Sequence, residues 1–415
     1  MSSMPSDPSP DSTLAFLREG YRFVGDRCDR HGSDIFQTRL MLEPTICLRG
    51  RPAAELFYDD DKFVRHGAMP MRGQRTLTGV GGVQGLDDAA HRARKAMLMS
   101  IMTPAAIDRL GELFDDEWRA RVPVWVRSGP VVMYDEVGRM LARAVCAWAG
   151  VPLAGADVAS RAADLHAMIE APAAVGPRHW RGLLARRRAE PWLGDLVERV
   201  RRGALPAPEG SALRVIAEHR DDQERLLPRR IAAVELLNVL RPTVALDRYV
   251  VFAALALHDH PRWRERVPGD EPATTSFVHE VRRHYPFFPV AAARVRRSFG
   301  WQGHDFPQGR RVLLGLYATN HHPRLWPEPE RFRPERFTGW PGDPFSLVPQ
   351  GGGEHFAGHR CAGEWLTVEL MKRAVGNLTG TMRYRVPPQD LALDLGRMPT
   401  LPPSGFVVDG VRRIG

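Results

Sequence analysis

A glycine-rich loop that runs into a helix around a single cysteine constrains this chain most strongly. The stretch from 349 to 373 reads PQGGGEHFAGHRCAGEWLTVELMKR, so Cys361 follows a run of glycines and precedes a segment with helical spacing of apolar residues. Glycine lets a backbone approach a flat ligand closely, and a helix N-terminus stabilises a thiolate through its N–H groups and dipole. The combination suits a cysteine that binds a metal ion, although a lone buried cysteine in a loop is also common.

The hydrophobic pattern predicts a mainly helical protein with a minor β component. The 415 residues, 43% of them hydrophobic, are enough to build a large core. A proline- and glycine-rich stretch from 320 to 360 has little periodicity, and a run of that length normally carries function or wraps a cofactor. Periodicity and turn signals predict strands within 35–58 and several helices within 88–168. They also predict helical character over 178–202, one long helix over 228–258 and a final helix over 363–378.

We expect one continuous domain over residues 13–415, preceded by a disordered tail over residues 1–12, which are rich in serine, proline and aspartate. Four cysteines without a CxxC pair give no disulfide framework, and the N-terminus lacks the order of a signal peptide. No apolar run of about 20 residues is present, so no membrane span is expected. These features favour a cytoplasmic protein.

The formal net charge of +9 comes almost entirely from arginine, because Lys62, Lys95 and Lys372 are the only lysines. Arginine runs such as 186–188 can face nucleic acid or an anionic membrane, but solvated helix faces are the simpler interpretation. No nucleic-acid-binding motif is present, so we expect no nucleic-acid partner. Peripheral association with a membrane stays open as an alternative for the arginine-rich segment that follows Val175.

Two further motifs change the interpretation of the cysteine loop. The stretch HEVRRHYP places Glu280 and Arg283 on one face of a helix, and PERFRPERFTGW supplies Arg336 about fifty residues later. Glu-x-x-Arg alone is a weak signal, but this order of motifs, ending in a glycine-rich loop with one cysteine, is specific. The sequence resembles a cytochrome P450, a heme-thiolate enzyme, over essentially the whole chain.

The resemblance implies a cytochrome P450 fold, with heme b between the long central helix and the cysteine loop. Cys361 would then be the axial thiolate ligand of the iron. Glu280, Arg283 and Arg336 would form a buried charge network behind the heme. The acidic groups of the heme would meet the side chains of His91, Arg94, His359 and Arg360. His91 and Arg94 could instead be ordinary surface residues.

Departures from the general cytochrome P450 pattern point to one subgroup. Glu354, Ala357 and His359 stand where the usual loop has an aromatic, a glycine and a basic residue, and the central helix lacks a clear acid–alcohol pair. The stretches LRPTVAL, RRHYPFFPVAAARV and PQGGGEHFAGHRCAGEW resemble the fatty-acid peroxygenases of the superfamily. Such enzymes use hydrogen peroxide directly, with no obligatory reductase, and oxidise long-chain fatty acids at the alpha or beta carbon.

Arg241 and Pro242 interrupt the apolar run VELLNVLRPTVALDRYV. A proline costs about 3 kcal/mol in a helix interior, and a buried arginine needs an anionic partner. In the resemblance, Arg241 holds the substrate carboxylate, which also relays a proton, and Pro242 makes room for peroxide. Without the resemblance, the simpler account is a kinked helix in which Arg241 pairs with an internal acid such as Glu235 or Asp247. The hypothesis predicts that Arg241→Ala abolishes fatty-acid oxidation and leaves heme binding intact.

Further candidates come from the same resemblance. Gln84 stands where relatives have glutamine or histidine, and glutamine goes with hydroxylation, whereas histidine goes with decarboxylation to terminal alkenes. Thr78 replaces a phenylalanine that relatives often carry. Candidates for lining the acyl pocket are Thr78, Val175, Phe287, which could instead be ordinary core, and Phe288.

Three other functions compete with a peroxygenase. A conventional monooxygenase would need electrons from a redox partner, and a heme protein without catalysis would bind heme but form no product. In the third, Cys361 is structural and no heme binds. The sequence does not indicate the oligomeric state, the preferred chain length or the ratio of alpha to beta attack.

Overall fold

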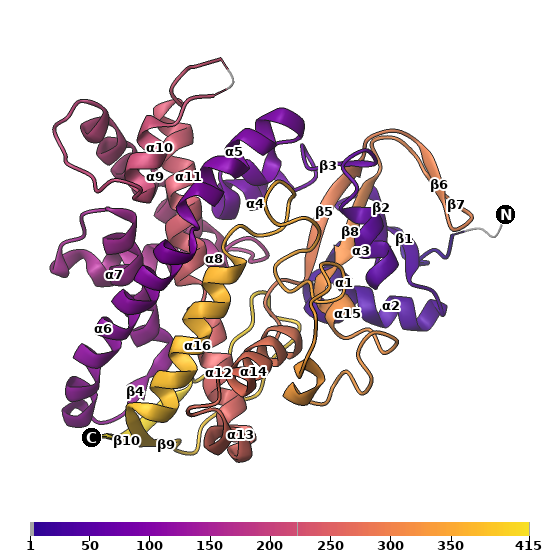
Figure 1. Ribbon diagram of the computed structural model, residues 1–415. Coiled ribbons are helices and arrows are strands. Elements are labelled where there is room, and N and C mark those ends of the chain that lie inside the picture. The colour runs from indigo at the N-terminus through magenta and orange to yellow at the C-terminus, as the bar shows by residue number, and fades with distance from the viewer. Residues whose placement is uncertain (1–3, 222, 415) are drawn as a thin grey trace.

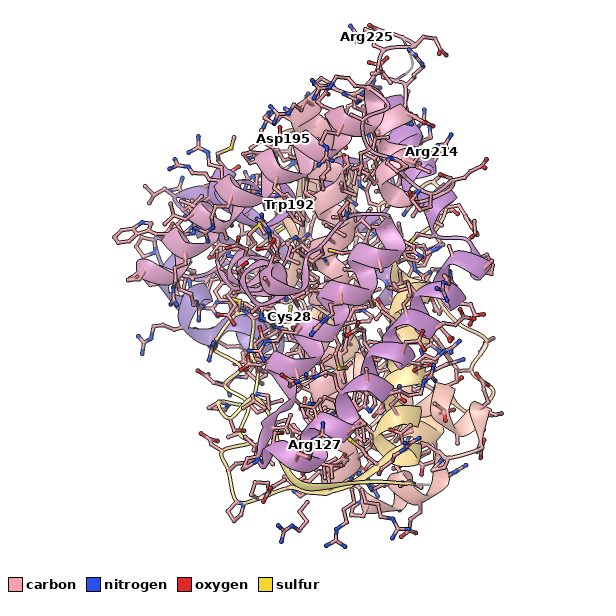
Figure 2. All side chains as sticks on the ribbon, turned by 90° about the vertical axis from the view of Figure 1, so that its left-hand side faces the viewer. Cys28, Arg127, Trp192, Asp195, Arg214 and Arg225 are labelled. Carbon is pink, nitrogen blue, oxygen red and sulfur yellow. The ribbon has the colours of Figure 1, made fainter. Side chains whose placement is uncertain are left out.

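The computed structural model describes residues 4–221 and 223–414. Helices fill one half of the molecule and a small mixed sheet lies at the other, near the N-terminus (Figure 1). Figure 2 views the helical half, where Arg214 and Arg127 lie toward opposite ends. The helices are α1 (Thr13–Glu19), α2 (Phe23–His31), α3 (Arg51–Phe57), α4 (Met71–Gly73), α5 (Asp88–Ile101), α6 (Pro104–Ser128), α7 (Met133–Ala149), α8 (Val158–Glu170), α9 (Pro177–Arg201), α10 (Ala212–Glu218), α11 (Arg229–Val244), α12 (Asp247–Asp259), α13 (Pro261–Arg266), α14 (Glu271–His284), α15 (Leu316–Asn320) and α16 (Glu364–Gly380).

Short turns of 3₁₀- or π-helix connect several of these helices. The one that matters for the site is the π-helical turn η2 (Gln74–Thr78), which ends at Gly79. The others are η1 (Gly20–Arg22), η3 (Val83–Gly85), η4 (Gly155–Asp157) and η5 (Pro334–Phe337).

The sheet that faces the N-terminus has five strands in the order β1-β2-β8-β5-β3. Strands β2 and β8 run parallel, with Ile46 opposite Val312, and the other neighbours are antiparallel. A three-stranded sheet, β4-β10-β9, closes the opposite end, and β6 and β7 form a hairpin. The strands are β1 (Ile35–Leu40), β2 (Glu43–Leu48), β3 (Phe63–Val64), β4 (Val131–Val132), β5 (Val290–Val295), β6 (Phe299–Trp301), β7 (His304–Phe306), β8 (Arg311–Gly315), β9 (Met382–Arg385) and β10 (Val407–Arg413).

The predicted mainly helical fold with a minor β component is confirmed. The largest hydrophobic cluster joins α6, α7, α11, α12, α14 and α16, and a separate cluster lies under the sheet. The irregular segment before α16 runs through the middle of the molecule in Figure 1, between the helical half and the sheet. This position brings the cysteine loop close to elements from both halves.

The predicted disordered tail over 1–12 is wrong for the residues that are described. Gln37 of β1 donates its N–H to the Pro5 carbonyl at 2.8 Å and accepts the Asp7 N–H at 2.9 Å. Asp7 is buried and pairs with Arg27 of α2 at 2.5 Å. The polar composition suggested a loose tail, but its groups have partners on β1 and α2. Residues 1–3 lie outside the described residues.

The single helix predicted over 228–258 is also wrong, because the chain breaks between α11 and α12. Helix α11 continues through Pro242 to Val244, and the break follows at residues 245–246. There, Leu246 N bonds Thr243 O at 3.2 Å and Arg248 N bonds Ala245 O at 3.3 Å, which are the shorter i to i−3 bonds of a tighter turn. Arg241 therefore lies in the last turn of α11.

Candidate active site

Cys361 lies between the glycine-rich loop and the first turn of α16. Burial raises the pKa of its thiol, and only the Gly363 N–H among nearby backbone groups opposes this effect. The sequence argument expected the helix start to stabilise a thiolate, but burial outweighs that effect at Cys361. A bound metal ion deprotonates such a thiol outright. The Gln350 side-chain nitrogen donates to the Cys361 sulfur at 3.9 Å, and this contact orients the sulfur.

The three glycines of the loop are required by close packing. Gly351 and Gly353 have φ of +94° and +86°, which other residues rarely adopt. A Cβ on Gly352 would lie 2.4 Å from the Pro344 carbonyl oxygen, and one on Gly353 would lie 3.0 Å from Tyr58. The loop is thus fixed against the end of α3, which sets the path of the backbone to Cys361.

A buried group of nitrogen-bearing side chains lies beside the cysteine loop. His91 of α5 and His359 stack with ring centroids 3.8 Å apart. Lys95 donates to the Arg360 carbonyl, and Arg65 has one guanidinium nitrogen that is buried without a partner among the described residues. Arg65, His91 and Lys95 are each less than a tenth exposed.

Among the described residues, Asp87, 4.0 Å from His359, is the only carboxylate at ion-pair distance from this group. Burial and then the positive charge of Lys95 lower the pKa of His91 to about 4, and burial and then Arg65 lower that of His359 to about 2. Burial lowers the pKa of Lys95 to about 8. A buried site with four such groups suits a ligand with acidic substituents. Sequence reasoning missed Arg65 and Lys95, although Lys95 shares a helix face with His91 at i, i+4.

Arg360 and Arg94, the two other residues predicted to meet a ligand's acidic groups, form ion pairs within the protein. Arg360 pairs with Glu364 at 2.5 Å, and Glu364 also accepts from Arg282 at 2.6 Å. Arg94 pairs with the fully buried Glu235 of α11 at 2.6 Å. Each arginine thus has a carboxylate partner in the protein, and Arg94 joins α5 to α11. A role for Arg360 and Arg94 toward a ligand's acidic groups stays a prediction.

Glu280, Arg283 and Arg336 meet in the structure. Arg283 donates to both oxygens of Glu280, at 2.7 and 2.8 Å, and Arg336 donates to Glu280 at 3.1 Å. Glu280 and Arg283 are fully buried. Arg283 also donates to the Asn320 carbonyl at 2.9 Å, and the Asn320 side chain accepts the Val348 N–H at 2.9 Å. The group thereby connects α14 to the segment that leads into the cysteine loop.

Arg241 is buried, and within the described residues it has neither a hydrogen-bond acceptor nor a carboxylate at ion-pair distance. Burial lowers its pKa to about 9, with a further decrease from the charge of Arg186. The internal partners considered from sequence are engaged elsewhere, since Glu235 pairs with Arg94 and Asp247 with His166. An unpaired buried guanidinium is costly, so the side chain is set up to receive an anion.

Two neighbours of Arg241 were not foreseen from sequence. Asn238, one turn earlier on α11, donates to the Gln84 side-chain oxygen at 3.2 Å and thereby holds this predicted residue near Arg241. Arg186 of α9 donates to the Leu77 carbonyl at 3.3 Å, and its Nη2 is buried without a partner among the described residues. No local motif marks Arg186, because it is one of many arginines on α9.

The predicted acyl-pocket residues lie in different settings. Thr78 is buried at the end of η2, beside the segment that Arg186 contacts. Phe287 stacks on Tyr249 at 4.2 Å against the main core, and Phe288, 38% exposed, packs edge-on to it. Val175 is 72% exposed in the α8–α9 connection, so the structure does not bring it into the buried site.

Comparison with known proteins identifies related molecules. The family model "Cytochrome P450" matches residues 258–390. Cytochrome P450SP alpha (CYP152B1), solved with (R)-ibuprophen, is 48% identical over 97% of this chain and 99% of that chain, with a TM-score of 0.95. Cytochrome P450EX alpha (CYP152N1), solved with myristic acid, is 45% identical over all of both chains, with a TM-score of 0.97.

A variant of cytochrome P450 OleT, solved with arachidonic acid, is 34% identical over 100% of this chain and 99% of that chain, with a TM-score of 0.97. The match to the first curated relative is partial. It is the trimethyltridecatetraene synthase of Zea mays, 30% identical over 167 residues, and the match spans 37% of this chain and 28% of that protein.

Proposed function

The chain belongs to the cytochrome P450 superfamily, in the group of P450SP alpha and P450EX alpha, and on that premise we propose that it is a fatty-acid peroxygenase. In this proposal it uses hydrogen peroxide to hydroxylate the alpha or beta carbon of a long-chain fatty acid, and no reductase is obligatory. Its cofactor is heme b with a cysteine thiolate ligand. Residues 13–415 form one heme-thiolate domain of a cytoplasmic enzyme.

The residues around the cysteine loop fit this cofactor. Cys361 supplies the thiolate, since Cys28, Cys47 and Cys146 are buried among apolar side chains. Arg65, His91, Lys95 and His359 would hold the acidic substituents, which supply the negative charge that this buried group lacks. When bound, heme b contributes the oxidising chemistry that no amino-acid side chain provides.

Arg241 is the single observation that carries the substrate assignment. A fatty-acid carboxylate fits an arginine that is buried without a counter-ion, because a charge-assisted pair offsets the burial of both groups. The guanidinium also fixes the orientation of the carboxylate, so the alpha and beta carbons occupy a defined position. P450EX alpha with myristic acid and OleT with arachidonic acid are consistent with substrates of this class.

The held carboxylate also serves as the proton carrier that α11 does not provide. Pro242 and Thr243 follow Arg241, and the Thr243 hydroxyl donates to the Val239 carbonyl at 2.9 Å. A carboxylate oxygen beside the peroxide accepts a proton from one peroxide oxygen and returns it to the other. Pro242 loosens the end of α11 and makes room for the peroxide.

Hydroxylation is favoured over decarboxylation by Gln84. Its side chain is held by Asn238 near Arg241, and an amide cannot exchange a proton near neutral pH as a histidine can. Formation of terminal alkenes is the second candidate outcome. A conventional monooxygenase supplied by a redox partner is the third, and the position of Arg241 beside Pro242 argues against it.

Product analysis of the purified holoprotein tests the proposal. Myristic acid and hydrogen peroxide, without reductase or NADPH, should give 2- or 3-hydroxymyristic acid. Arg241→Met should reduce kcat/KM about a hundredfold or more, while the heme absorption spectrum remains. Faster turnover with reduced ferredoxin and dioxygen than with peroxide would overturn the peroxygenase assignment in favour of the monooxygenase, and a predominant C13 alkene would replace hydroxylation with decarboxylation.

A further inference from the structure

Large apolar side chains are exposed at one corner of the molecule. Met41 lies in the β1–β2 turn, where its N–H bonds the Thr13 hydroxyl at 2.5 Å at the start of α1. Arg72 beside Met71 donates to the Ala174 carbonyl in the α8–α9 connection. The first contact joins the β1–β2 turn to α1, the second joins α4 to the α8–α9 connection, and Leu17 of α1 and Ala173 line one cavity that links the two groups. The large hydrophobic residues exposed on these segments and on the adjoining α9 are Leu14, Met41, Leu42, Met71, Val175, Trp180 and Leu184.

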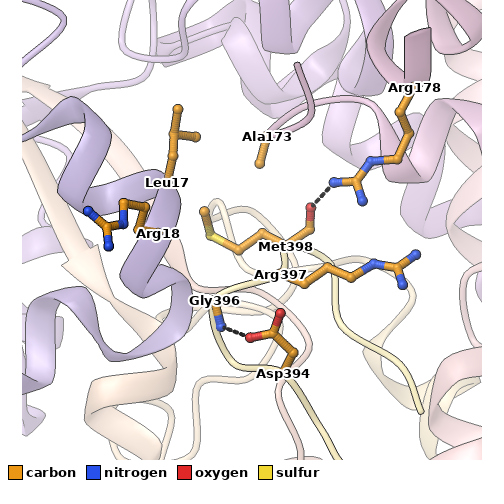
Figure 3. A pocket seen from close by; sticks show the side chains of 8 residues that line it. All are labelled: Leu17, Arg18, Ala173, Arg178, Asp394, Gly396, Arg397 and Met398. Atoms are coloured by element: carbon orange, nitrogen blue, oxygen red, sulfur yellow. Dashed lines mark hydrogen bonds between the residues drawn. The ribbon is translucent and has the colours of Figure 1, made fainter. Parts of the chain in front are cut away.

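A cavity of about 410 Å³ opens between the same elements (Figure 3). Leu17 and Arg18 of α1 lie on one side, and Arg178 of α9 lies on the other. The C-terminal loop closes it with Arg397 and Met398, whose carbonyl accepts from Arg178 at 3.3 Å. The cavity therefore lies within the apolar corner and is bounded by three separate segments of the chain.

Positive charge dominates this cavity. Three arginines line it, at 18, 178 and 397, against one carboxylate, Asp394. A second carboxylate, Glu170, lies 3.9 Å from Arg397 but is closer to Arg248, at 3.3 Å. Burial lowers the pKa of Arg178, Glu170 opposes this shift, and the charge of Arg397 adds to it. Figure 3 shows Arg178 and Arg397 extending along the same edge of the cavity.

We propose that the apolar corner, together with its arginine-lined cavity, binds anionic phospholipid bilayers. Exposed tryptophan and leucine side chains partition into the headgroup region, and arginines are attracted to anionic lipid. A patch of several apolar side chains on a folded protein marks an interaction surface. The inference rests on the proposed function for its purpose, because long-chain fatty acids reside in bilayers. Binding itself needs no turnover.

Sedimentation of the holoprotein with vesicles tests this surface. Vesicles of phosphatidylcholine with phosphatidylglycerol should bind the protein, and added salt should weaken binding. The double variant R178Q/R397Q should bind them about tenfold more weakly than the wild type, because two charges leave the surface. W180S should weaken binding to both anionic vesicles and vesicles of phosphatidylcholine alone.

A matched control removes the same charge elsewhere. Arg214 and Arg225 lie at the far end of the helical half, labelled in Figure 2, and are both exposed. R214Q/R225Q should bind vesicles as the wild type does. Equal weakening by both double variants would overturn the proposal, because it would show attraction by net charge alone. Absence of binding to anionic vesicles, or binding unaffected by R178Q/R397Q, would overturn it too.

The test of vesicle binding is separate from the test of the proposed peroxygenase function. Vesicle binding is measured without peroxide, and hydroxylation of dissolved myristate is measured without vesicles. A protein that binds vesicles but forms no hydroxy acid retains the surface and loses the peroxygenase assignment. If R178Q/R397Q loses affinity for dissolved myristate but not for vesicles, the cavity takes free fatty acid and the bilayer proposal is wrong.

Discussion

Arg241 carries a buried charge that no neighbouring side chain among the described residues balances. Other buried arginines are treated differently, since Arg283 has Glu280 and Arg248 has Asp247 and Glu170. Arg186 adds positive charge near Arg241. The folded protein thus bears a cost at one position in the absence of substrate, which an incoming carboxylate removes.

Replacement of Arg241 should therefore stabilise the protein while it removes function. We expect Arg241→Met to raise the free energy of unfolding of the substrate-free holoprotein by about 1–3 kcal/mol, because methionine fills the space without a charge. Saturating myristate should stabilise the wild type but not the variant. Urea titration followed by circular dichroism measures both. Arg248→Met is the control and should destabilise, since it removes the buried arginine that pairs with both Asp247 and Glu170. A destabilised Arg241→Met would mean that Arg241 is balanced in the native state.

At the residue scale, sequence alone identified side chains whose chemistry is unusual for their local pattern. Cys361 and Arg241 were found because a cysteine after glycines and an arginine beside proline in an apolar run both need an explanation. Arg65 and Arg186 were missed because no local motif marks them. Arg360 also has a partner that the sequence made visible, because Glu364 lies at i+4.

Between α11 and α12, and around η2, the backbone departs from regular helix where the candidate substrate site lies. Apolar periodicity does not change across 245–246, so the sequence predicted one helix over 228–258. The break is a tight turn stabilised by i to i−3 hydrogen bonds, which periodicity does not express. Most helix and strand positions were predictable because each has its own apolar face and turn signals.

Gly79, at the end of η2, occupies a position that has no room for a side chain. Its φ is +81°, and a Cβ would lie 2.5 Å from Val234 of α11 and 2.9 Å from Arg186. Gly79→Ala should lower the free energy of unfolding by about 2 kcal/mol or more and change the ratio of 2- to 3-hydroxy acid, since Thr78 would move. Gly85→Ala is the control, because a Cβ there meets nothing within 4 Å. Equal stability of the two variants in thermal denaturation would contradict the close contact.

Helix α14 makes the stability of the protein depend on pH. His279 and His284 each lie beside an arginine side chain, at 3.3 and 3.4 Å, and only a neutral ring accepts an N–H there. Burial, with the adjacent Arg282 or Arg283, lowers the pKa of His279 to about 3 and that of His284 to about 4. In the unfolded chain both pKa values are near 6.5.

Stability should therefore fall as the pH decreases from about 6.5 toward 4, because the unfolded chain then binds more protons than the folded one. Each histidine contributes a slope of up to ~1.4 kcal/mol per pH unit in this window and none above it. Urea titrations at pH 7.5, 6 and 5 should show a smaller slope for the double variant H279Q/H284Q than for the wild type. The same substitution at the exposed His66 controls for residue type. An unchanged slope would mean that neither ring is held neutral.

At the scale of the whole molecule, the site depends on how distant segments are joined. The order Glu-x-x-Arg, Arg336 segment and cysteine loop identified the superfamily from sequence, but not the contacts that join them. Asn320 receives Arg283 at its carbonyl and holds Val348 through its side chain, so α14 is linked to the approach to Cys361. Pairings across such separations depend on packing of the whole chain, which local patterns do not specify.

Glu280 is the centre of this long-range connection. It accepts from Arg283 and Arg336, and also from the Arg333 N–H at 2.7 Å, while fully buried. Glu280→Gln keeps the shape but leaves two arginines without a counter-charge. We expect a loss of about 3–5 kcal/mol in the free energy of unfolding. A domain is stable by only about 5–15 kcal/mol, so heme retention should fall as well.

Two measurements separate this connection from a general effect of charge removal. Guanidinium chloride titration of the holoprotein gives the stability, and the Soret absorbance per protein gives the heme content. Glu328→Gln removes the same charge from the loop before η5, but Glu328 is 54% exposed and pairs with Arg331 at 3.2 Å, so it should cost no more than about 1 kcal/mol and retain heme. If the two variants lose equal stability and equal heme, the buried position of Glu280 is not what joins α14 to the cysteine loop. If Glu280→Gln alone loses both, the geometry around Cys361 depends on a carboxylate located on another helix.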